Sequence, residues 1–120
     1  MGYDAYVHIN KKYTKATIEK LLLMLGYEKR KGFFYCGNDD EYKYFTGVQV
    51  WLFDENKEER IYNVRCPIFA VVYDLKKVNE TIRSLKQYCD ATFESDIGKN
   101  RYFPESQFTK GAESGCYFAV

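Results

Sequence analysis

Hydrophobic and polar residues alternate along the first stretch of the chain. Tyr3, Ala5, Val7 and Ile9 occupy every second position. A period of two is typical of a β-strand with one buried face. The pattern therefore predicts a strand over residues 3–10, whose polar face carries Asp4, Tyr6, His8 and Asn10.

A helical pattern follows this strand. Thr14 is a residue type that caps helix N-termini, and Gly26 suits the position just after a helix C-terminus. Four apolar residues between them recur at i, i+3, i+4 and i+7, which predicts a helix with one buried stripe. That stripe consists of Ile18, Leu21, Leu22 and Leu25.

Three further strands are predicted in the middle of the chain, over residues 28–36, 42–53 and 60–65. Glycine, asparagine and aspartate at 37–40 form a turn signal between the first two, and a charged loop at 54–59 precedes the third. The long strand at 42–53 has one aliphatic face and one aromatic face. We expect the aliphatic face, with Val48, Val50 and Leu52, to lie in the core, and the aromatic face to carry Phe45, Trp51 and Phe53.

The second half of the chain repeats the order strand, helix, strand. Pro67 interrupts an extended run, and the apolar residues 68–73 after it predict a buried central strand. Asp74 is the expected N-cap of a helix with a second apolar stripe. Another strand is expected from Ala91, followed by a long loop from Ser95 to Gly115 and a short closing strand at 116–120. The stripe of the second helix consists of Leu75, Val78, Ile82 and Leu85.

This order of elements predicts an α+β fold in one domain covering residues 1–120. Two helices on one face of a mostly antiparallel sheet form a two-layer sandwich, and we expect a ferredoxin-like arrangement with an extra hairpin. No apolar stretch approaches the roughly 20 residues that cross a bilayer, and the N-terminus has no apolar signal-peptide core. We therefore expect a cytoplasmic protein with no membrane partner.

Aromatic residues are unusually frequent, with 12 Tyr, 9 Phe and one Trp making up 18% of the chain. A small core cannot bury all of these rings, so some must lie at half-exposed positions. Such rings either reflect the strand propensity of tyrosine or form a binding surface. The predicted partner-binding residues are Tyr6, His8, Phe45, Trp51 and Phe53.

Charge is segregated although the net formal charge is only +1. Residues 11–31 contain seven basic and two acidic side chains, whereas residues 36–59 contain two basic and seven acidic ones. One interpretation of this segregation is that turns collect charge of either sign by chance. The other is a bipolar surface that steers a charged partner. The predicted steering residues are Lys29, Arg30 and Lys31 on the basic side and Asp39, Asp40 and Glu41 on the acidic side.

Recognisable reaction centres are absent from the sequence. His8 is the one histidine, and no nucleophile elbow, zinc-protease motif or phosphate-binding loop accompanies it. The four cysteines are 23 to 30 residues apart with no CxxC pair, so we expect reduced, mostly buried thiols. We predict no catalytic residue, no metal and no cofactor.

These observations favour a small non-enzymatic protein-binding module. Its build is similar to that of phage- or plasmid-borne inhibitor and immunity proteins, although similarity of build is a weak argument for function. One alternative is single-stranded nucleic-acid binding on an aromatic sheet face. Residues 31–35 resemble the start of the RNA-recognition-motif signature, but Phe34 stands where a small residue belongs, and the stretch follows the first helix.

Two further hypotheses stay open. The protein could be a small enzyme or small-molecule binder that uses His8. The aromatic face could also be covered, either by a second copy in a homodimer or by the segment 95–120.

Overall fold

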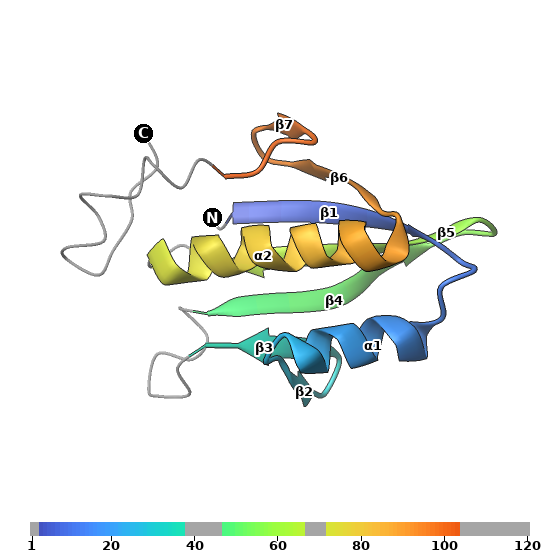
Figure 1. The fold of residues 1–120 in the computed structure, drawn as a ribbon, viewed down its shortest axis with the longest axis horizontal. Coiled ribbons are helices and arrows are strands. Elements are labelled where there is room, and N and C mark those ends of the chain that lie inside the picture. The colour runs from blue at the N-terminus through green and yellow to red at the C-terminus, as the bar shows by residue number, and fades with distance from the viewer. Residues whose placement is uncertain (1–2, 38–46, 67–71, 104–120) are drawn as a thin grey trace.

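The computed structural model describes residues 3–37, 47–66 and 72–103 of the protein. In this part, seven strands form one antiparallel sheet in the spatial order β2-β3-β4-β5-β1-β6-β7. Two helices lie together on one face of it (Figure 1). The elements are β1 (Tyr3–Asn10), α1 (Lys15–Met24), β2 (Glu28–Arg30), β3 (Phe33–Cys36), β4 (Val48–Glu55), β5 (Glu59–Cys66), α2 (Val72–Cys89), β6 (Thr92–Ser95) and β7 (Gly98–Lys99). The predicted α+β class is confirmed, with a sheet larger than that of a ferredoxin-like fold.

The first strand and helix form where the sequence predicts them. In β1, Ala5, Val7 and Ile9 are fully buried while the residues between them stay partly exposed. Thr14 caps α1, because its hydroxyl accepts a hydrogen bond of 3.2 Å from the backbone N–H of Thr17. Gly26 follows the helix with a φ of +96°, in the left-handed region that favours glycine.

The strand expected over residues 28–36 is instead a hairpin of β2 and β3. Lys31 and Gly32 form its turn, and Gly32 has a φ of +86°, which ends the first strand. Strand β4 starts at Val48 in the described part and runs to Glu55, two residues beyond the predicted end. The expected turn at 38–40 and the first part of the predicted strand, 42–46, lie outside the described residues.

The strand predicted over residues 68–73 is wrong at its end, because α2 already begins at Val72. A short apolar run does not distinguish a buried strand from the first turn of a buried helix. Asp74 therefore lies in the first turn of α2 rather than at its N-cap, and its carboxylate accepts a 3.0 Å hydrogen bond from the backbone N–H of Gly47. Residues 67–71 lie outside the described part. The predicted stripe of α2 is confirmed, with Leu75, Val78, Ile82 and Leu85 fully buried.

The C-terminal part contains more structure than a loop. Strand β6 is followed by the two-residue strand β7, within the segment expected to be irregular. The closing strand predicted at 116–120 lies outside the described residues. Of the described cysteines, Cys66 and Cys89 are buried free thiols and Cys36 is a half-buried one.

The core lies between the helices and the sheet face that they cover. Fully buried side chains from α1, α2, β4 and β5 meet there, including Leu22, Ile82, Val50 and Val64. Polar contacts also join the two helical segments, because the Lys77 amine donates to the Leu25 carbonyl at the end of α1. The opposite sheet face, which we call the open face, carries no helix among the described residues (Figure 1).

Candidate functional site

A row of side chains crosses the open face. Cross-strand pairing places Trp51 of β4 beside Asn63 of β5, Asn63 beside Tyr6 of β1, and Tyr6 beside Glu94 of β6. The Asn63 side chain is 2% exposed, and its amide donates a 3.0 Å hydrogen bond to the carbonyl of Ala5. This buried amide holds the row in place, with Trp51 and Tyr6 on either side.

A β-bulge adds Phe53 to this face. The pairing of β4 with β5 shifts between Leu52 and Asp54, which leaves Phe53 as the extra residue. Its ring lies 4.9 Å from the ring of Tyr6, centroid to centroid, in an edge-on arrangement. Phe53 is 56% exposed, which is high for a phenylalanine. Of the predicted partner-binding residues, Tyr6, Trp51 and Phe53 thus share one surface.

Carboxylates surround this aromatic pair. Burial raises the pKa of Tyr6 above its ordinary value, and the negative charges of Asp4 and Asp96 raise it further, while Arg65 opposes them. Arg65 lies 3.7 Å from the Asp4 carboxylate, which compensates part of the positive charge of Arg65. The carboxylates of Asp4, Asp96 and Glu94 thus act on Tyr6 against the single guanidinium of Arg65.

His8 lies on the same face between two carboxylates. Its Nδ1 is 3.0 Å from Glu59 Oε1, and its Nε2 is 3.7 Å from Glu94 Oε1. Beside it is a shallow hollow of about 270 Å³ that is also lined by Lys99. The two carboxylates orient the imidazole ring, and Thr92 supplies a hydroxyl to the lining of this hollow. The described residues contain no group of three or more His, Cys, Asp or Glu side chains placed to hold a metal ion.

The basic steering residues do not form one patch. Lys29 is directed to the helix side, where its amine makes a 3.0 Å ion pair with Glu19 of α1. Arg30 pairs with Glu28 at 3.0 Å and its guanidinium lies over the ring of Tyr35. Lys31 is exposed in the hairpin turn. Phe45 and the acidic steering residues Asp39, Asp40 and Glu41 lie outside the described residues.

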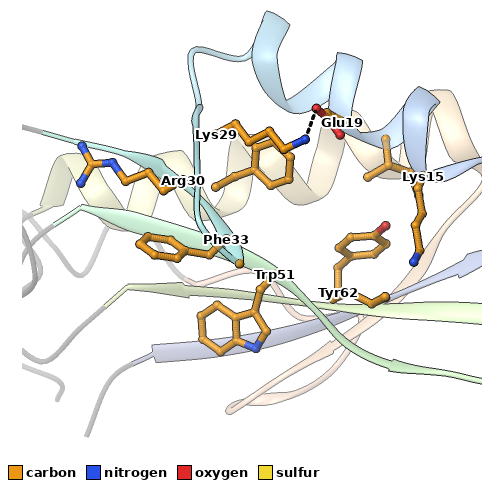
Figure 2. A pocket seen from close by; sticks show the side chains of 11 residues that line it. Lys15, Glu19, Lys29, Arg30, Phe33, Trp51 and Tyr62 are labelled. Carbon is orange, nitrogen blue, oxygen red and sulfur yellow. Dashed lines mark hydrogen bonds and ion pairs between the residues drawn. The ribbon is translucent and has the colours of Figure 1, made fainter.

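A larger hollow, of about 350 Å³, opens where the β2–β3 hairpin ends (Figure 2). We call it the edge cleft. Strand β3 starts only at Phe33, so among the described residues no strand pairs with β4 beyond Val50 on that side, and residues of α1 line the gap. The cleft is lined by Lys15, Ile18, Glu19, Lys29, Arg30, Gly32, Phe33, Phe34, Trp51, Leu52 and Tyr62.

The sequence did not predict that these residues form a cleft. Trp51, Lys29 and Arg30 were predicted site residues, whereas Lys15 and Tyr62 were not. Lys15 is the first residue of α1, and the sequence predicts the N-cap before it. That Lys15 shares a cleft with Tyr62 of β5 depends on how the strands pair. Only the sheet order, with β5 next to β4, brings Tyr62 beneath the start of α1.

Comparison with known proteins gives no relative: no family model, no curated protein and no solved structure matches this chain. Within the described part, neither helix is long and apolar enough to cross a membrane.

Proposed function

We propose that this protein is a non-enzymatic module that binds another protein on its open face, in the manner of an inhibitor or immunity protein. The observation that carries the proposal is the Tyr6–Phe53 pair, whose outer ring is more than half exposed. Tyrosine and tryptophan dominate the energetic centres of protein interfaces, and phenylalanine is also enriched there. Trp51 lies two strands from Tyr6 and extends the aromatic surface.

The charge around the pair indicates the partner's chemistry. Asp4, Asp96 and Glu94 all act on Tyr6, with Arg65 as the opposing charge. A partner that places a basic rim around an apolar or aromatic centre would complement this surface. The same negative charge disfavours a nucleic acid on the open face, because phosphates would be repelled.

The test compares three forms of the protein. A binding protein captured from a cell extract is purified, and its dissociation constant is measured with the wild type, Phe53→Ala and Met24→Ala. Met24 is the control because it is 75% exposed on α1, on the other side of the sheet. Loss of a central aromatic anchor costs about 2 kcal/mol or more, so we expect Phe53→Ala to bind roughly thirtyfold more weakly.

Two further results are expected from this measurement. Met24→Ala binds like the wild type, and higher ionic strength weakens binding because charge complementarity is screened. Equal affinity for the wild type and Phe53→Ala would overturn the proposal.

A second copy of this chain is another candidate occupant of the open face, and an experiment must distinguish it from a different partner protein. A symmetric dimer would bring the acidic residues of two open faces together, which like-charge repulsion disfavours. Light scattering across a dilution series tests this. A mass that stays at 14.2 kDa excludes the dimer, whereas a dimer that Phe53→Ala dissociates identifies the second copy as the partner.

We also propose that part of the sheet has a ferredoxin-like arrangement. When the β2–β3 hairpin and β7 are set aside, the order is strand, helix, strand, strand, helix, strand, as in that motif. In this interpretation the hairpin is an addition, and the edge cleft forms at the place where the addition joins the sheet.

A further inference from the structure

The edge cleft contains polar groups that the described structure does not use. The Tyr62 side chain is 5% exposed, but its hydroxyl makes no hydrogen bond to the described residues. No fully buried side-chain oxygen or nitrogen of the described part lacks a partner, so this hydroxyl reaches the open space of the cleft. Burial raises the pKa of Tyr62, which keeps the hydroxyl protonated and able to donate.

Lys15 is the second unused donor. It lines the same cleft from the first turn of α1, and it has no ion pair with any described residue. In Figure 2 the side chains of Lys15 and Tyr62 extend toward the same part of the cleft. A lysine ammonium and a tyrosine hydroxyl that line one cleft with no acceptor among the described residues suit an anionic group on a ligand.

Aromatic rings supply the other wall. Phe33 and Trp51 lie together on the side away from α1 (Figure 2). Phe34 also lines the cleft, and its pairing with the fully buried Val50 places it on the helix side. Each ring offers an apolar flat surface of the kind on which nucleic-acid bases stack. A ligand that fills this cleft therefore combines a flat ring with an anionic group.

The charge of the lining indicates which anion fits. The lining holds three basic side chains, those of Lys15, Lys29 and Arg30, and two of them are paired with carboxylates. The excess positive charge of the cleft is therefore that of Lys15. Glu19 is already engaged by Lys29, and Arg30 by Glu28. A terminal phosphate carries a charge of about −1.5 to −2 at neutral pH and has three strong acceptor oxygens, so it can accept from both the Lys15 amine and the Tyr62 hydroxyl.

We propose that the edge cleft binds one nucleotide unit, its base against the aromatic wall and its phosphate at the Lys15 amine and the Tyr62 hydroxyl. The volume of about 350 Å³ lies at the lower end of the range for small-molecule sites, which suits one unit rather than several. A free mononucleotide and the end of a single strand share this chemistry. This site is separate from the protein-binding surface proposed above, although Trp51 borders both.

Trp51 is the only tryptophan in the chain, so its fluorescence reports directly on the cleft. Adenosine monophosphate is titrated into the wild type, Lys15→Ala, Tyr62→Phe and the control Lys20→Ala, an exposed lysine of the same helix. We expect saturable binding by the wild type and by Lys20→Ala. Lys15→Ala should bind about tenfold more weakly and Tyr62→Phe about fivefold more weakly, since each loses one hydrogen bond to a charged group.

Fragments of the ligand separate the two parts of the proposal. Adenosine lacks the phosphate and inorganic phosphate lacks the base, so each should bind at least tenfold more weakly than the nucleotide. A short oligonucleotide with a terminal phosphate identifies the source: tighter binding than the mononucleotide assigns the cleft to a strand end, and weaker binding assigns it to the free nucleotide. Phe53→Ala should leave nucleotide binding unchanged.

Three results would overturn the inference. The first is no saturable fluorescence change below about 1 mM nucleotide, the affinity expected of even a weak specific site. The second is equal binding by the wild type, Lys15→Ala and Tyr62→Phe, each shown to be folded by its thermal transition. The third is adenosine binding as tightly as the nucleotide.

Discussion

A buried hydrogen bond between Tyr27 and Thr81 positions the start of the β2–β3 hairpin against α2. The Tyr27 hydroxyl lies 2.6 Å from Thr81 Oγ1, and the Thr81 hydroxyl lies 2.7 Å from the carbonyl of Lys77. A threonine hydroxyl has one hydrogen, and the Lys77 carbonyl can only accept. Thr81 therefore donates to Lys77, and Tyr27 donates to Thr81. Tyr27 is 3% exposed, and its burial raises the pKa of the hydroxyl.

This direction of donation makes the two single substitutions unequal. Tyr27→Phe removes a donor and leaves Thr81 with its bond to Lys77, which should cost about 1 kcal/mol. Thr81→Val keeps the shape of the side chain but leaves the Tyr27 hydroxyl buried without an acceptor. Such an unsatisfied group costs about 1–3 kcal/mol, so this variant should be the less stable of the two.

The double variant tests the argument most sharply. Adding Tyr27→Phe to Thr81→Val removes the unsatisfied hydroxyl, so stability should recover by about 1 kcal/mol instead of falling further. Urea denaturation followed by circular dichroism gives the free energies of unfolding, compared at equal m-values. Thr92→Val, at an exposed strand position, is the control and should stay within about 0.5 kcal/mol of the wild type. A double variant less stable than Thr81→Val would refute the assigned donor.

Two other predictions concern pH and backbone geometry. Burial raises the pKa of Cys66, so above an ordinary thiol pKa of about 8.5 the unfolded chain loses a proton that the native protein keeps. The free energy of unfolding should then fall by about 1.4 kcal/mol per pH unit for this group, and urea midpoints from about pH 8 to about pH 10 should fall less steeply in Cys66→Ala. Gly47 has a φ of +87°, and an added Cβ would lie 2.8 Å from the Tyr35 ring, whereas Gly26 at +96° has open space around it. Gly47→Ala should therefore lower the thermal midpoint clearly more than Gly26→Ala, whose cost is backbone strain of about 1 kcal/mol; equal shifts in calorimetry would contradict this.

Local patterns predicted the elements whose ends carry their own chemical signals. Thr14 and Gly26 mark the ends of α1, and alternation marks β1, because capping and side-chain periodicity depend on neighbours in sequence. The hairpin of β2 and β3 was missed because Gly32, in the middle of a predicted strand, was not interpreted as a turn. The start of α2 was missed because a short apolar run suits either a buried strand or a buried helix.

The candidate sites were predicted only in part, for a related reason. Alternation alone placed Tyr6, His8 and Trp51 on a face away from the core, and the register confirms that they share it. The bulge that leaves Phe53 beside Tyr6 has no sequence signal here, since it arises from the pairing of β4 with β5. A side chain's neighbours across a sheet are set by strand order, which no local pattern contains.

The short β3 strand connects the two proposed sites. Because β3 starts at Phe33 and pairs with β4 only from Val50 back to Val48, the rest of β4 has no partner on that edge in the described part of the chain. The same gap gives the edge cleft its opening and leaves Trp51 between the cleft and the open face. A longer hairpin would pair with β4 beyond Trp51 and close the cleft. The size of the β2–β3 hairpin therefore determines whether this sheet has an edge cleft.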